Sequence, residues 1–113
     1  MKTKVKICGI RTLEAAQTAV DAGADFLGFN FVKTSKRYIE PEKALEIIKL
    51  IKSKVKTVGV FQDEKAETAN EIALLLNLDF VQLHGVENSE YIKSIKVPVI
   101  KSIILDDNPK KKS

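Results

Sequence analysis

Five short apolar runs recur along the chain, and the first four are each followed by a segment with helical patterning. The runs begin near Val5, Phe26, Thr57, Phe80 and Val99. They are rich in β-branched and aromatic residues, and glycine or proline stands in several connections between them. Strands that alternate with helices through short connections form βαβ units around a parallel sheet. Two architectures satisfy this pattern: an open doubly wound sheet and part of a (βα)8 barrel.

The intervening segments carry helix start and stop signals. A first helix is predicted from Leu13 to Ala22, with Thr12 as its N-cap and Gly23 in the C′ position. A second is predicted from about Glu42 to Lys54, just behind Pro41. A fourth, short helix is predicted from about Ser89 to Ile95. The residues expected on buried helix faces are Leu13, Ala16, Ala19 and Val20 in the first helix, Leu45, Ile48, Leu50 and Ile51 in the second, and Ala69, Ile72, Ala73 and Leu76 in the third.

The length and composition indicate one globular domain. The chain has 113 residues, of which 44% are hydrophobic and 30% are charged, so residues 1–113 are expected to form a single domain with its own core. The fifth strand is predicted from Val99 to Leu105, and residues 106–113 are expected to be an irregular polar tail.

The charge distribution argues against nucleic acid as a partner. The net charge is +4 at pH 7, and the lysines are interleaved with acidic residues such as Glu42, Glu46 and Glu64, so no basic stripe forms. No apolar run is long enough to cross a bilayer, and the first residues do not resemble a signal peptide. With one cysteine no internal disulfide is possible. We therefore expect a cytoplasmic protein without a membrane partner.

Polar side chains occur where three of the predicted parallel strands end. Cys8, Asn30 and His84 close the first, second and fourth strands, and active sites of parallel α/β folds gather at this edge of the sheet. Because strand side chains alternate, Lys6 and Cys8 share one face. The chain contains neither glycine-rich phosphate motif of nucleotide-binding folds, and one cysteine and one histidine are too few for a metal site. A lone cysteine in a strand is more often a packing residue, and a histidine at a strand end can be a satisfied core residue.

Five segments of the chain carry a family resemblance. They are Lys6-Ile7-Cys8-Gly9-Ile10, Gly23-Ala24-Asp25 with Leu27-Gly28-Phe29, Ser35-Lys36-Arg37-Tyr38-Ile39, Val58-Gly59-Val60-Phe61 and Val81-Gln82-Leu83-His84-Gly85. In this order and spacing, from Val5 to about Ile104, they resemble the phosphoribosylanthranilate isomerases. The resemblance implies a (βα)8 barrel of tryptophan biosynthesis that needs no cofactor and no metal. Its reaction is the Amadori rearrangement of N-(5-phosphoribosyl)anthranilate to 1-(2-carboxyphenylamino)-1-deoxyribulose 5-phosphate.

The same resemblance implies roles for three residues. Cys8 corresponds to the general base, which removes the proton from C2 of the sugar as a thiolate. Arg37 corresponds to the arginine that holds the anthranilate carboxylate, for which its planar fork is suited. His84 corresponds to a histidine that lines the pocket. Without the resemblance, an arginine in a lysine-rich loop is most often only solvated.

The chain departs from the family pattern in its length. A (βα)8 barrel usually takes at least ~200 residues, whereas five strands and four helices are predicted here. The family's general acid, an aspartate on strand six, and its phosphate loops after strands seven and eight have no counterpart. We expect the N-terminal portion of a barrel that is inactive by itself, whether the shortening is natural, a frameshift or a choice of segment.

Two other interpretations stay open. The alternative is a non-catalytic half-barrel that self-associates or needs a complementing chain, because open sheet edges and an uncovered apolar face favour association. A different phosphosugar barrel enzyme is a weaker candidate, since the segments around Cys8 and His84 argue against it.

Overall fold

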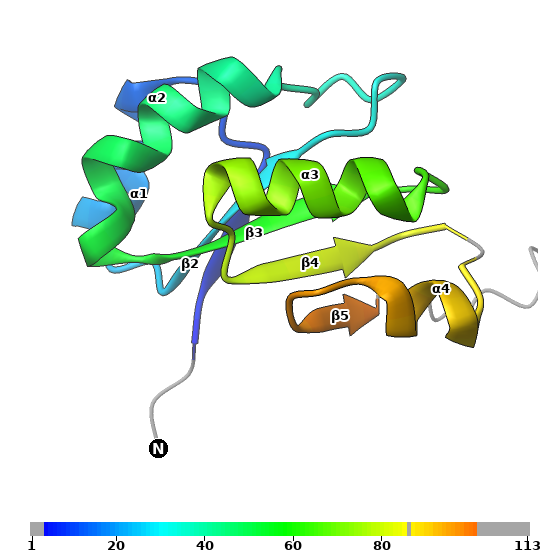
Figure 1. The fold of residues 1–113 in the computed structure, drawn as a ribbon. Coiled ribbons are helices and arrows are strands. Elements are labelled where there is room, and N and C mark those ends of the chain that lie inside the picture. The colour runs from blue at the N-terminus through cyan, green and yellow to red at the C-terminus, as the bar shows by residue number, and fades with distance from the viewer. Residues whose placement is uncertain (1–3, 86, 102–113) are drawn as a thin grey trace, which may run out of the picture.

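The computed structural model describes residues 4–85 and 87–101, which form one parallel sheet of five strands with helices between them (Figure 1). The strands are β1 (Lys6–Cys8), β2 (Phe26–Asn30), β3 (Lys56–Phe61), β4 (Phe80–Leu83) and β5 (Val99–Lys101). The helices are α1 (Leu13–Asp21), α2 (Pro41–Ile51), α3 (Ala66–Leu76) and α4 (Ser89–Ser94), and the short 3₁₀ helix η1 (Lys52–Lys54) follows α2.

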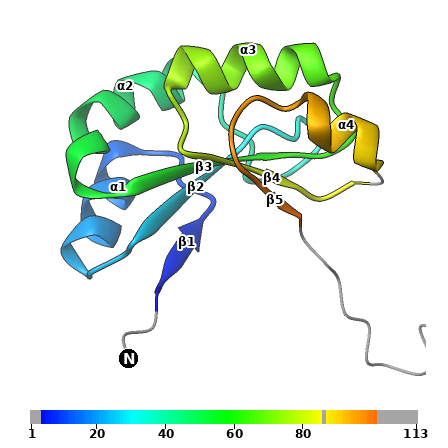
Figure 2. The ribbon, with the colours of Figure 1, turned by 60° about the horizontal axis from the view of Figure 1, so that its bottom comes forward.

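The order of the strands decides between the two predicted architectures. Every strand pairs in parallel with the strand that precedes or follows it in sequence, in the order β1-β2-β3-β4-β5. The helices lie on one side of a curved sheet and leave the other side bare in the described residues (Figure 2). A doubly wound sheet reverses its strand order and carries helices on both faces, whereas a βα barrel does neither. The fold is therefore part of a (βα)8 barrel.

The core lies between the convex face of the sheet and the helices. Alternate strand residues point into it, and Leu27, Phe29, Phe61, Val81 and Leu83 are fully buried there. Small residues on the helices let the two layers approach closely. The helix residues that are buried are Ala16, Ala19, Ala44, Ile47, Ile48, Ile51, Ala69, Ala73 and Leu76.

The prediction that Leu13 and Leu50 are buried is wrong. Leu50 is 63% exposed and Leu13 is 42% exposed. In α2 the buried stripe is centred on Ala44 and Ile47 to Ile48, so that Leu45 and Leu50 fall on opposite flanks of it, and only Leu45 packs against the core. Leu13 is the first residue of α1 and lines a surface groove together with Leu50 of α2.

The local signals at the helix ends are confirmed. The Thr12 hydroxyl oxygen accepts a hydrogen bond from the Ala15 backbone N–H at 3.0 Å, and Pro41 is the first residue of α2. Gly23 follows α1 with a φ of +94°, the left-handed conformation expected at C′. The first strand is shorter than predicted, because Gly9 turns the chain with a φ of +84°. The predicted end of the fifth strand at Leu105 and the tail at 106–113 lie outside the described residues.

The connections that lead into β2 and β4 are built alike. A left-handed residue, Gly23 or Asn77, ends the preceding helix, with φ of +94° and +52°. Two residues later, Asp25 and Asp79 stand directly before the strands. The carboxylate of Asp25 accepts the backbone N–H of Val5 at 2.8 Å.

At the second of these connections, the Asp79 carboxylate accepts the backbone N–H of Thr57, also at 2.8 Å. It also accepts the Thr57 hydroxyl at 3.2 Å and the Lys52 ammonium at 3.1 Å. Thr57 is fully buried. Each aspartate therefore ties the start of one strand to its neighbour, at the amino edge of the sheet, opposite the site described next.

Candidate active site at the carboxyl edge of the sheet

Cys8 is the last residue of β1, and its thiol lies on the concave side of the sheet. It is exposed and pairs in register with Gly28 of β2. A Cβ on Gly28 would lie only 2.9 Å from the Cys8 Sγ. The absence of a side chain at Gly28 is therefore what makes room for the thiol.

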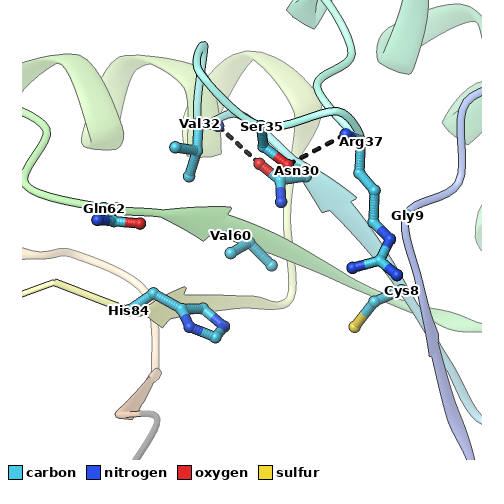
Figure 3. A pocket seen from close by; sticks show the side chains of 9 residues that line it. All are labelled: Cys8, Gly9, Asn30, Val32, Ser35, Arg37, Val60, Gln62 and His84. Atoms are coloured by element: carbon cyan, nitrogen blue, oxygen red, sulfur yellow. Dashed lines mark hydrogen bonds between the residues drawn. The ribbon is translucent and has the colours of Figure 1, made fainter.

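Arg37 reaches the same place from the loop after β2. Its side chain passes over Gly9, where an added Cβ would lie 2.7 Å from the Arg37 Cδ. The backbone N–H of Arg37 donates to the Ser35 hydroxyl oxygen at 3.0 Å, so the loop itself helps to fix the residue that carries the guanidinium. Figure 3 shows the guanidinium beside Cys8.

The loop that carries Arg37 is closed at its base by Asn30. The Asn30 side-chain oxygen accepts the backbone N–H of Val32 at 2.8 Å, and its carbonyl oxygen accepts that of Ile39 at 2.9 Å. Residues 32–38 therefore form a loop after β2, and Asn30, the last residue of that strand, holds both ends of the loop.

His84 follows β4 directly and lies across the pocket from Cys8 (Figure 3). Its backbone N–H donates to the carbonyl oxygen of Phe61 at 2.9 Å, which extends the strand pairing by one step. Its Nε2 lies 3.1 Å from the Nε2 of Gln82. The side-chain oxygen of Gln82 accepts a hydrogen bond from the ammonium of Lys6.

Cys8, Arg37 and His84 line one cavity of about 190 Å³, which we call the carboxyl-edge pocket. The structure thus brings the three predicted site residues together at the end of the sheet where active sites of βα barrels lie. Arg37 is a permanent cation, and no carboxylate occurs among the described lining residues, so the pocket favours an anionic ligand. The lining residues are Cys8, Gly9, Asn30, Val32, Ser35, Arg37, Val60, Gln62 and His84.

Other kinds of site find no counterpart in residues 4–85 and 87–101. No three histidine, cysteine, aspartate or glutamate side chains lie close enough together there to hold a metal ion. Within the same ranges, no helix has the length and apolar character to cross a membrane.

The described chain forms half of a parallel βα barrel, with a polar pocket at the carboxyl ends of its strands. This is the architecture of a βα-barrel enzyme. Residues 5–113 match the family model described as N-(5'phosphoribosyl)anthranilate (PRA) isomerase. The chain belongs to this family.

Individual relatives agree with the family match. The chain is 48% identical over 99 residues to the N-(5'-phosphoribosyl)anthranilate isomerase of Trichlorobacter lovleyi, which covers 88% of the chain and 48% of that relative. It superposes on the phosphoribosyl anthranilate isomerase of Thermotoga maritima with a TM-score of 0.86 and 44% identity, covering 88% of this chain and 50% of that one. A second structure, of a phosphoribosyl anthranilate isomerase in complex with reduced 1-(o-carboxyphenylamino)-1-deoxyribulose 5-phosphate, gives a TM-score of 0.91 and 40% identity, covering 98% of this chain and 58% of that one. The chain spans about half the length of the curated relatives it matches.

Proposed function

We propose that this chain supplies the first half of a phosphoribosylanthranilate isomerase active site, acting in tryptophan biosynthesis in the cytoplasm. The observation that carries the proposal is that Cys8, Arg37 and His84 converge on the carboxyl-edge pocket, which has no carboxylate among its described lining residues. The substrate is N-(5-phosphoribosyl)anthranilate, a small molecule with a carboxylate and a phosphate.

Cys8 acts as the general base. Once the furanose ring has opened to the protonated imine, the Cys8 thiolate removes the proton from C2. The electron pair of that C–H bond forms a C1=C2 double bond while the π pair of the C=N bond moves onto nitrogen, and the resulting enaminol tautomerises to the ketone. The thiol is suited to this role because it is exposed on the concave face and has room beside Gly28.

Arg37 holds the anthranilate carboxylate. A guanidinium offers two parallel N–H donors to a carboxylate, and the passage of Arg37 over Gly9 keeps these donors close to Cys8. A carboxylate bound by Arg37 orients the substrate in the pocket that Cys8 also lines. His84 lines the opposite wall.

The acid at the ring oxygen and the phosphate loops belong, by family resemblance, to the sixth and later strands. The 113-residue chain by itself is therefore not expected to turn over the substrate, because loss of one acid–base partner costs about 10²–10⁴-fold and loss of the phosphate site removes remote binding energy. A polypeptide that corresponds to the second half of a relative is the natural complement.

The test follows the fluorescence of the substrate, which is lost on turnover. We expect no activity from the chain alone, activity from the chain with the complementing polypeptide, and loss of that activity in Cys8→Ala. Turnover by the chain alone would place the acid within residues 1–113, and full activity of complemented Cys8→Ala would remove Cys8 as the base.

A second arm of the test addresses Arg37. Arg37→Lys keeps the charge and loses the two-pronged geometry, so we expect KM to rise by about 10-fold or more. Arg11→Lys is the matched control: Arg11 is exposed, does not line the pocket, and makes one 3.4 Å contact with the Lys36 carbonyl. Equal effects of the two substitutions would contradict the carboxylate role.

The alternative is a non-catalytic half-barrel that self-associates. Its support is the concave face, which no helix of the described residues covers and on which Ile100 of β5 is 37% exposed. Failure of the complemented chain to turn over substrate, together with a stable homo-oligomer, would favour it.

A further inference from the structure

Gln82 is a buried polar residue whose role the isomerase proposal leaves open. It lies in the middle of β4 and is only 7% exposed. It shares the concave face with His84 two residues later, and with Val60 and Ile100, with which it pairs across the sheet. Since both of these partners are apolar, the buried amide must find its hydrogen bonds elsewhere.

The first partner of the amide is Lys6. Its ammonium donates to the Gln82 side-chain oxygen, although β2 and β3 separate β1 from β4. An ammonium carries three donors and no acceptor. This contact therefore fixes which end of the amide faces Lys6: it is the oxygen, and the NH₂ group points the other way.

The second partner is His84, and it receives the NH₂ group. The Gln82 Nε2 lies 3.1 Å from the His84 Nε2, and an amide NH₂ can only donate. The ring Nε2 must then accept, so it carries no proton. The proton of the neutral imidazole is consequently on Nδ1.

We propose that Gln82 is a positioning residue: oriented by Lys6, it holds His84 as a neutral imidazole protonated on Nδ1. This tautomer is the less populated one for free histidine in water, so the network reverses an intrinsic preference. With its Nε2 lone pair engaged, His84 does not compete with Cys8 as a base at that nitrogen. It orients the substrate instead. This last role rests on the proposed function, whereas the tautomer does not.

The tautomer is directly measurable because His84 is the only histidine of the chain. Nitrogen-15 spectra of the histidine-labelled chain, recorded at about pH 8.5, well above the ordinary histidine pKa of about 6.5, separate a protonated ring nitrogen from an unprotonated one. We expect Nδ1 protonated and Nε2 unprotonated in the wild type, both alone and with an unlabelled complementing polypeptide.

Three variants test the chain of contacts. Gln82→Leu and Lys6→Met should each shift His84 toward the Nε2-protonated form, the first by removing the donor and the second by freeing the amide. Lys6→Arg should restore the wild-type spectrum, since it returns a donor. Gln62→Leu is the matched control, because Gln62 lines the same pocket without a hydrogen bond to His84 among the described contacts, and it should leave the spectrum unchanged.

The kinetic readout uses the complemented enzyme. Gln82→Leu should raise KM by about 10-fold with a smaller change in kcat, the signature of lost substrate positioning, while Cys8→Ala lowers kcat. An Nε2-protonated wild type, or an Nδ1-protonated form that survives both Gln82→Leu and Lys6→Met, would overturn the inference. If the complemented chain is inactive but the spectra behave as expected, the tautomer assignment stands and the proposed function fails.

Discussion

Removing the carboxylate of Asp79 is expected to cost about 2–3 kcal/mol of the free energy of unfolding. The carboxylate accepts the N–H and hydroxyl of fully buried Thr57, at 2.8 and 3.2 Å. A hydrogen bond to a charged group contributes about 1.5–3 kcal/mol, and a buried donor left without a partner adds to the loss. The ion pair with Lys52, each side chain 30% exposed, contributes at most about 0.5 kcal/mol.

Asp25→Ala is the matched control for Asp79→Ala. Asp25 holds the equivalent position before β2 and accepts the Val5 N–H at the same 2.8 Å, but Val5 is 45% exposed. Water replaces the carboxylate there, so we expect a loss of only about 0.5–1 kcal/mol. Urea unfolding followed by circular dichroism, with equal m-values in all variants, measures the difference. Equal losses at both positions would refute the reasoning that burial of Thr57 sets the magnitude.

The pH dependence gives a second check on Asp79. Burial raises its pKa, but the Thr57 backbone N–H, the Lys52 ammonium and the Thr57 hydroxyl outweigh this effect together and hold the pKa below 3.8. Because the pKa is lower in the folded chain than in the unfolded one, the carboxylate stabilises the fold above about pH 4, and this contribution is lost as the pH falls through the folded pKa. The stability gap between wild type and Asp79→Asn should therefore shrink below about pH 4. A gap that widens there would contradict the assignment.

Two further predictions concern the concave face. Gly28→Ala places a methyl group 2.9 Å from the Cys8 Sγ. The resulting displacement of the thiol should lower kcat of the complemented enzyme by about 10²-fold. An unchanged kcat in a folded variant would contradict this prediction. The isolated chain should self-associate, and sedimentation velocity should show that Ile100→Lys weakens this association. Leu74→Lys is the control, because position 74 on α3 is 83% exposed, and it should leave association unchanged. A wild-type chain that is monomeric at every concentration would count against this.

Signals that depend only on neighbouring residues were sufficient for much of the fold. The Thr12 cap, Pro41 at the start of α2 and Gly23 after α1 are all where the sequence predicts them. Strand polarity likewise predicted that Cys8 and His84 would share an edge of the sheet, and both line the carboxyl-edge pocket.

Features that depend on the rotation and curvature of whole elements were not predictable. Leu45 and Leu50 lie at similar angles on either side of the α2 stripe, and only packing against the sheet decides that Leu50 is exposed. The contact of Lys6 with Gln82 needs the sheet to curve, because two strands lie between them. The one available signal for Gln82 was its position two residues before His84, on the same face of the strand.

The matching connections before β2 and β4 mean that the described chain contains two similar modules, β1-α1-β2 and β3-α3-β4, followed by α4 and β5. Each module is a strand–helix–strand unit in which an aspartate stands directly before the phenylalanine that begins the second strand, in Asp25-Phe26 and Asp79-Phe80. The rings of these two phenylalanines meet edge to face at 5.9 Å on the concave side. At the far end of the same strands stand Asn30 and His84, both lining the pocket. The repeating unit of this architecture is thus a pair of strands that carries its own anchor at one end and a pocket-lining polar residue at the other.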